Sequence, residues 1–294
     1  MQVQTRFDQT HFAPDPREFY RVMHGLEYRN AAWSVPVFAA AWAEVTRLRG
    51  LDRAGLVDIA AGYGVVSALL RHDIELQGLL ERYVQRPIED ASAEEVLTLD
   101  RSWFQSRATH NPSIRTIALD ISREALAYGR AVGLFDEAFA EDLGNAPPSR
   151  GLRDSLQDCA LMVEAGSVAH MEPRILRELL DAAGDPKPWV LTAPVRGNHR
   201  PAALQVMRDA GLVVEQIPIR PFPIRRFVDR AEQTRACQEI RRQGLDPDGV
   251  ETSGCYHGCL FLARPEQETQ RPAVELLRRA HGDAGVDRRR EITP

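Results

Sequence analysis

The chain has 294 residues, of which 44% are hydrophobic and 27% charged, a composition typical of one large globular domain. Its formal net charge of −5 gives no overall basic field for nucleic acid or anionic lipid, so we expect neither as a partner. The N-terminal stretch MQVQTRFDQTHF lacks the apolar core of a signal peptide, and no apolar run is long enough for a membrane span. We therefore expect a cytoplasmic protein.

Short apolar runs alternate with helical stretches along most of the chain. The apolar runs lie at 55–61, 115–121, 137–142, 158–166, 188–195, 212–219 and 258–264. Most are continuously apolar, which is typical of strands buried on both faces. Strands that alternate with helices predict an α/β fold, a doubly wound and mostly parallel Rossmann-like sheet of seven strands. Ser122 is expected to cap the helix that follows it.

Three segments stand outside this alternation. Residues 1–54 contain an aromatic-rich helical stretch, which we predict to be a lid or cap. The alternatives are a lid over the site formed by residues 11–45 and a helical cap packed on the sheet. The main domain spans 55–265, and residues 72–113 form a helical insertion within it. Residues 266–294 are rich in Arg, Glu and Gly and are expected to form a surface tail.

The four cysteines predict neither a disulfide framework nor a metal site. Cys255, His257 and Cys259 lie in the sequence CYHGC, where strand alternation places them on one face. No second pair of Cys or His residues supplies the four ligands of a structural zinc. Buried free thiols are the favoured interpretation.

A glycine-rich turn joins the first predicted strand to the next helix in DIAAGYGVVSALL, residues 58–70. One glycine suffices for a tight turn, whereas Gly62 and Gly64 together would also let a ligand approach the main chain. Ligands of open parallel sheets bind outside the carboxyl ends of the strands. There Asp120 could accept hydrogen bonds from a ribose diol, and Asp142 from an adenine amino group.

VDIAAGYG, ALDIS, AEDL and LMVEAGSVAH resemble, in this order, the nucleoside motifs of class I S-adenosylmethionine-dependent methyltransferases. DPREFYRVMHGLEY, ALLRHD and YGRAVGLFDEAFAEDL are similar to a bacterial subgroup often found in natural-product gene clusters. The resemblance implies S-adenosylmethionine as cofactor, with Asp58 and Gly62 at its methionine end, Asp120 at the ribose and Asp142 at the adenine. The full set of predicted cofactor-binding residues is Asp58, Gly62, Tyr63, Gly64, Asp120, Ile121, Asp142, Leu143, Glu164 and Ser167.

Two departures from a dinucleotide-binding unit are visible. Ser67 stands where the third glycine of G-x-G-x-x-G would be, and a sulfonium cofactor needs no pyrophosphate nest, which disfavours NAD. Asp58 and Asp120 are 62 residues apart, against about 20 in the usual unit. The insertion at 72–113 accounts for this distance if it leaves the first two strands adjacent.

The chemistry is left open between three alternatives. Methylation of a small-molecule acceptor is favoured, with His170 as general base and Tyr28 on the acceptor side, beside Arg29 and Asn30. The second alternative closes the cofactor's own aminobutyrate chain into a small ring such as azetidine-2-carboxylate and releases methylthioadenosine. The third is an inactive cofactor-binding scaffold. Arg225 and Arg226 are interpreted as a solvated edge rather than a carboxylate site. A homodimer is kept as a candidate assembly.

Overall fold

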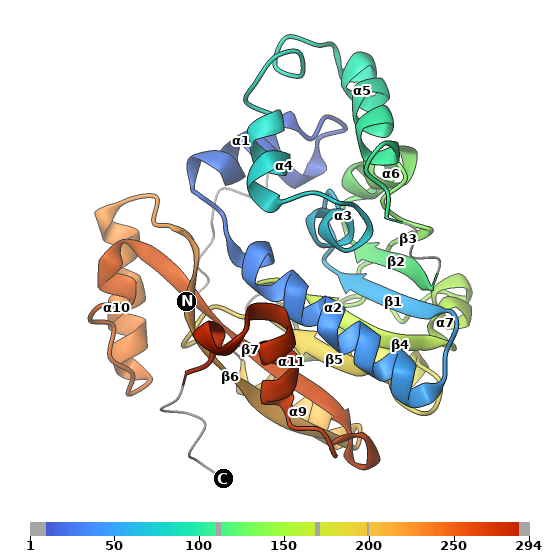
Figure 1. The fold of residues 1–294 in the computed structure, drawn as a ribbon, viewed down its shortest axis with the longest axis vertical. Coiled ribbons are helices and arrows are strands. Elements are labelled where there is room, and N and C mark those ends of the chain that lie inside the picture. Colours follow the sequence, from blue (N-terminus) through green and yellow to red (C-terminus); the bar gives the residue numbers. More distant parts are fainter. Residues whose placement is uncertain (1–9, 110–112, 168–170, 199, 288–294) are drawn as a thin grey trace.

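A seven-stranded sheet runs through the computed structural model of the protein, which describes residues 10–109, 113–167, 171–198 and 200–287 (Figure 1). The strand order is β3-β2-β1-β4-β5-β7-β6. The strands are β1 (Ala54–Ile59), β2 (Ile114–Asp120), β3 (Glu137–Ala140), β4 (Cys159–Glu164), β5 (Trp189–Thr192), β6 (Leu212–Arg226) and β7 (Cys255–Pro265). Strands β1 to β5 are parallel, and β7 is antiparallel to both β5 and β6. The predicted α/β fold with a mostly parallel sheet is confirmed.

Helices cover both faces of this sheet. They are α1 (Arg17–Gly25), α2 (Asn30–Arg49), α3 (Val65–Arg71), α4 (Leu76–Arg82), α5 (Ala93–Gln105), α6 (Arg123–Ala131), α7 (Arg150–Leu156), α8 (Pro173–Ala182), α9 (Pro201–Asp209), α10 (Arg230–Arg242) and α11 (Ala273–His281). Successive side chains of a strand point to opposite faces, so Leu56 and Val57 enter different hydrophobic cores. This two-sided burial explains why β1 and β4 are continuously apolar in sequence.

Helix α2 packs along one face of the sheet, against α3, β4 and α11 (Figure 1). Its residues Val37, Phe38 and Ala41 are fully buried there. Within the segment predicted to be a lid or cap, α2 is therefore a layer of the fold packed on the sheet. Helix α11 buries Leu276 and Leu277 against the same region, so part of the predicted surface tail also belongs to the core.

The insertion at 72–113 packs beside the sheet and leaves β1 and β2 paired in register. Its centre is the buried carboxylate of Asp100, which accepts hydrogen bonds from the hydroxyls of Tyr83 (2.9 Å) and Tyr128 (2.8 Å). Arg82 Nε donates to the same carboxylate at 2.8 Å. Tyr20 of α1 stacks on Tyr83 with ring centroids 4.1 Å apart. The N-terminal segment, the insertion and α6 therefore form one packed unit.

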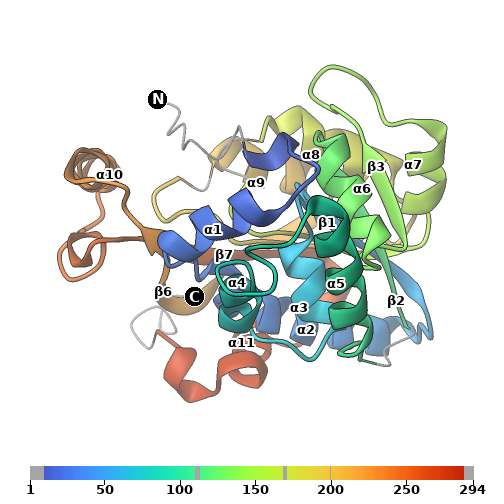
Figure 2. The same cartoon turned by 90° about the horizontal axis from the view of Figure 1, so that it is seen from above.

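Strands β6 and β7 continue their pairing beyond the sheet, from Phe222↔Gly258 to Arg226↔Cys255. Helix α10 follows this extension and stands apart from the sheet (Figure 2). Strand β6 contains three prolines, which an edge strand tolerates because its outer N–H groups need no partner strand.

Residues 26–29, between α1 and α2, attach to the outer edge of this extension. Arg29 N–H donates to the Ile224 carbonyl at 2.7 Å, and Arg226 N–H donates to the Leu26 carbonyl at 2.8 Å. These two hydrogen bonds fix the backbone on either side of Tyr28. No helix in the described part of the chain has the length and apolar character needed to cross a membrane.

Candidate functional site

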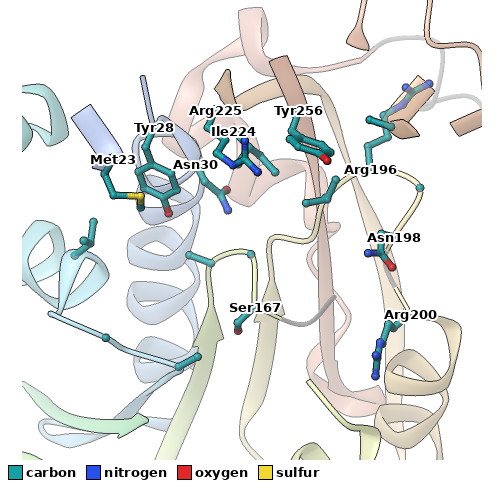
Figure 3. A pocket seen from close by; sticks show the side chains of 18 of the residues that line it. Met23, Tyr28, Asn30, Ser167, Arg196, Asn198, Arg200, Ile224, Arg225 and Tyr256 are labelled. Carbon is teal, nitrogen blue, oxygen red and sulfur yellow. The ribbon is translucent and has the colours of Figure 1, made fainter. Parts of the chain in front are cut away.

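A cavity of about 970 Å³ opens at the carboxyl ends of β1, β2 and β4, at the upper end of the range for ligand pockets of about 300–1,000 Å³ (Figure 3). Its inner half is formed by strand-end residues, among them Asp58, Ala60, Gly62, Asp120, Ile121 and Ser167. Its outer half is formed by the β6–β7 extension, α10 and the loop after β5, among them Arg196, Arg200, Ile224, Arg225, Arg235 and Tyr256. Tyr28 and Asn30 line the cavity between the two halves.

Asp58 lies at the end of β1 and is 2% exposed. Burial raises the pKa of its carboxyl to about 7, the nearby Asp120 and Glu164 carboxylates add to the rise, and a hydrogen bond from Ser67 opposes it. Ser67 Oγ donates to Asp58 Oδ2 at 3.0 Å. The residue at the third-glycine position therefore hydrogen-bonds the buried carboxyl. A cation placed beside Asp58 would favour its ionised form.

Gly62 is the glycine of the turn that lines the cavity, next to Ala60 and Ala61. Its φ of +52° is a conformation that glycine adopts without strain. Its N–H donates to Asp120 Oδ2 at 2.8 Å, while Asp120 Oδ1 accepts the Ser122 N–H at 2.8 Å. Asp120 therefore joins the two strand-end loops. Ser122 caps α6 through Ala125 N–H, as predicted.

Gly64 has a different role and is not among the lining residues. Its φ is +82°, and a Cβ at this position would lie 2.8 Å from the ring of Phe135 and 2.9 Å from Leu134. The second glycine of the turn is thus explained by turn geometry and packing against the segment after α6. From the sequence we inferred that the approach of a ligand requires this glycine. The contacts around Gly64 explain it without a ligand.

Two large apolar side chains remain exposed at the mouth of the cavity. Ile121, directly after Asp120, is 62% exposed, and Phe12 is 48% exposed. Ser122 Oγ donates to the His11 carbonyl, so the segment around Phe12 is held against the loop that carries Ile121. Exposed apolar groups at a cavity rim are typical of a ligand-binding surface.

Tyr63 and Glu164, two other predicted residues, contribute to the frame of the site rather than to its lining. The Tyr63 hydroxyl donates to the carbonyls of Thr10 (2.9 Å) and Ala13 (2.6 Å), and it thereby anchors the N-terminal segment. Glu164, 1% exposed, accepts the N–H groups of Ser167 at 2.6 Å and Ala193 at 3.1 Å, and so it orders the loop after β4.

Asp142 and Leu143 also lie away from the lining. Leu143 is buried in a core cluster. The two carboxylate oxygens of Asp142 accept Gly144 N–H at 3.0 Å and Asn145 Nδ2 at 2.7 Å, and the side chain turns back on its own loop. The predicted contact with an adenine amino group stays a prediction.

Tyr28 lines the cavity with its side chain directed inward (Figure 3). Burial raises the pKa of its phenol, and the negative charges of Glu164 and Asp58 raise it further. The hydroxyl therefore keeps its proton at neutral pH and can act as a hydrogen-bond donor. His170, the other predicted catalytic residue, lies outside the described residues.

Asn30, the first residue of α2, is fully buried and faces the same space (Figure 3). Its Nδ2 donates to the Ala193 carbonyl at 3.3 Å, whereas its Oδ1 has no hydrogen-bond partner among the described residues. A buried acceptor without a donor is costly.

Ala60, at the end of β1, lines the cavity with a φ of +56°, a strained value for a residue other than glycine. Nothing in the sequence around Ala60 indicates this conformation.

The outer half contains buried charges that the sequence did not reveal. Arg196 and Glu251 form an ion pair of 2.5 Å between side chains 9% and 2% exposed. Arg225 binds the Glu232 carboxylate through both terminal nitrogens, at 3.1 and 2.9 Å, and its guanidinium lies 4.8 Å from the Tyr256 ring centroid. The solvated-edge interpretation is therefore wrong for Arg225, while Arg226 is exposed and pairs with Glu27 at 2.9 Å.

Comparison with known proteins gives similarities in structure only. No family model and no curated protein matches the chain. Solved structures with a similar fold include the YcgJ protein from Bacillus subtilis (9% identity, TM-score 0.42, covering 77% of this chain and 97% of that one). Others are a TehB-like SAM-dependent methyltransferase from Corynebacterium glutamicum (13%, 0.37, 76% and 86%) and a SAM-dependent methyltransferase from Aquifex aeolicus (11%, 0.36, 89% and 100%). Identities and TM-scores are low, so no activity is transferred from these proteins.

Proposed function

We propose that the protein is an S-adenosylmethionine-dependent methyltransferase that acts on a small-molecule acceptor. The observation that carries this proposal is the inner half of the cavity, where Gly62, the Asp120 carboxylate and the exposed Ile121 side chain are contiguous with the buried Asp58. This arrangement offers acceptors for a sugar diol, an apolar surface for a base and a buried acid for a cationic group.

The residues present fit most of that cofactor. Asp120 would hold the ribose hydroxyls and Ile121 would pack on the adenine ring. Asp58 would accept hydrogen bonds from the amino group of the methionine end, together with the Oδ1 of Asn30, which has no hydrogen-bond partner among the described residues. Asp142, unlike Asp120, is not among the residues that line the cavity, and its oxygens accept hydrogen bonds within its own loop from Gly144 and Asn145.

When bound, the cofactor supplies a methyl group on a positively charged sulfur that is already a good leaving group. The chain then has to align the acceptor, exclude water and place a hydrogen-bond donor near the reacting atoms. Tyr28 is suited to position the acceptor, because its phenol stays protonated and its flanking backbone is fixed by the hydrogen bonds to β6.

The size and polarity of the cavity favour methyl transfer over ring closure of the cofactor. Closure needs only a cage around one molecule, whereas the outer half extends the space to α10 with a separate set of polar residues. This extension is the reason for proposing a second substrate.

Product analysis tests the proposal. The full chain is incubated with S-adenosylmethionine alone and with panels of small hydroxylated or amino acceptors, followed by chromatography of the nucleosides. We expect S-adenosylhomocysteine to accumulate only when an acceptor is present. Methylthioadenosine released from the cofactor alone would contradict methyl transfer and support ring closure.

A further inference from the structure

The outer half of the cavity carries an excess of positive charge. Its lining contains the arginines 196, 200, 225, 235 and 242, and its lining carboxylates are Glu239 and Glu251. The inner half, in contrast, is lined by the acidic Asp58 and Asp120. The two halves therefore differ in the sign of the charge they can accommodate.

Ion pairs neutralise only part of the excess. Arg196 pairs with Glu251, Arg225 with Glu232, and Arg242 with Glu239. Arg235 has no carboxylate within ion-pair distance in the part of the chain that the structure describes. Its charge is felt at the neighbouring Tyr256, where it opposes the rise in phenol pKa.

The outer half also contains buried donors that have no partner among the described residues. The Tyr256 hydroxyl has no hydrogen-bond partner among the described residues, although the side chain is only 7% exposed. Burial raises the pKa of this phenol, and the Glu232 carboxylate adds to the rise, so the group is a donor at neutral pH. Arg196 Nε is buried and likewise unpartnered within the described residues. Buried polar groups of this kind normally have a partner in the protein or a ligand.

Apolar surface lies between these donors. Ile224, Ala236 and Ile240 line the outer half, together with the ring of Tyr256. A ligand that pairs with these donors and covers this apolar surface must combine an apolar body with an anionic group.

We propose that the outer half binds the acceptor and that the acceptor is an apolar or aromatic carboxylate, anchored by Arg235 and Tyr256. The identification of this ligand as the acceptor rests on the proposed function. The anion site itself can be tested by binding alone. The carboxylate of the cofactor itself is the other source of this chemistry, and the experiment separates the two.

The test uses 2-naphthoate and 2-naphthamide, which share a ring system and differ in charge. Each is titrated calorimetrically into the full chain, with and without saturating S-adenosylhomocysteine. We expect 2-naphthoate to bind more tightly than 2-naphthamide, with an affinity that S-adenosylhomocysteine does not abolish. Arg235 is exposed, so Arg235→Gln should weaken 2-naphthoate by about fivefold, the upper value for an exposed ion pair, and leave 2-naphthamide unchanged.

Matched variants complete the design. Arg230→Gln removes the same charge from an exposed position on α10 outside the lining, and it should leave both affinities unchanged. Arg235→Lys should retain most of the preference for the anion, and Tyr256→Phe should reduce it. Equal binding of the two probes, or equal losses in Arg235→Gln and Arg230→Gln, would overturn the proposal. Competition between 2-naphthoate and S-adenosylhomocysteine would assign the anion site to the cofactor instead. Failure of S-adenosylhomocysteine to bind counts against the proposed function alone.

Discussion

The two halves of the cavity are built in different ways. In the inner half, Asp120 connects the loops after β1 and β2 through two backbone N–H groups, and Asp58 is buried with Ser67. In the outer half, long side chains from distant elements pair with one another, as Arg196 does with Glu251. The inner half is acidic and the outer half basic, so a cationic cofactor and an anionic acceptor would each meet the opposite charge.

The inner half thus depends mainly on backbone geometry, and the outer half mainly on the electrostatics of paired side chains. The inner half should be sensitive to changes of backbone conformation and of a single carboxylate. The outer half should respond to changes of charge and to salt concentration, because Arg235 and Arg242 are exposed.

The largest effect is expected from Gly62→Val. A branched side chain at a φ of +52° would distort the turn, and its Cβ would lie 3.5 Å from the His11 ring, which also lines the cavity, so S-adenosylhomocysteine affinity should fall by at least about 100-fold, or about 2.7 kcal/mol. Gly64→Ala is the matched control, because its Cβ would meet Phe135 rather than ligand. It should lower the melting temperature without a specific loss of affinity. Calorimetry and thermal unfolding distinguish the two, and unchanged affinity in Gly62→Val would contradict the account.

Asp58→Asn should remove a pH dependence of stability. The Asp58 carboxyl ionises near its ordinary pKa of 3.8 when unfolded and near 7 when folded, so between these values the folded chain binds more protons. The free energy of unfolding contributed by this group therefore falls as pH rises through this window, by up to about 1.4 kcal/mol per pH unit. Urea unfolding at pH 5, 6, 7 and 8 measures the slope. Asp90→Asn, at an exposed carboxyl, should keep the wild-type slope, and so would Asp58→Asn if the Asp58 pKa were ordinary.

Asp120→Ala should weaken S-adenosylhomocysteine binding by about 1.5–3 kcal/mol, the value of a charge-assisted hydrogen bond. A modest loss of apo stability should accompany it, since Gly62 N–H and Ser122 N–H each lose their acceptor. Asp142→Ala provides the comparison on the next loop. We expect its affinity to stay close to wild type; an equal loss in both variants would show that Asp142 reaches the cofactor.

Tyr28→Phe should have the smallest effect, a decrease in kcat of about tenfold with little change in cofactor affinity, as for one lost hydrogen bond of about 1.4 kcal/mol. Steady-state kinetics with the acceptor found by product analysis measures both quantities. Tyr83→Phe is a control, because that hydroxyl is buried with Asp100 away from the cavity and should affect stability only. A change confined to cofactor affinity would place Tyr28 in the inner half.

Local sequence signals predicted the fold and part of the inner half. Continuous apolar runs indicated buried parallel strands, Ser122 indicated its helix start, and the position of Asp120 followed from the strand end. The outer half could not be predicted in this way. The pairing of Arg225 with Glu232 depends on how α10 returns to the β6–β7 extension, and Arg196 meets Glu251 across 55 positions of the chain.

The N-terminal segment shows the same limit. Its aromatic density correctly required burial, but sequence could not tell which surface would cover it. Helix α2 packs on the sheet, and Tyr20 of α1 packs beside Tyr63 of the turn after β1. Only contacts distant in sequence, such as those of Arg29 with Ile224, place Tyr28 at the cavity.

The most direct test of the central claim is a calorimetric titration of the full chain with S-adenosylhomocysteine and, separately, with NAD. The account predicts a single site with micromolar affinity for S-adenosylhomocysteine, about −8 kcal/mol at 1 µM, and no measurable binding of NAD. Equal or tighter binding of NAD, or no heat from S-adenosylhomocysteine, would contradict it.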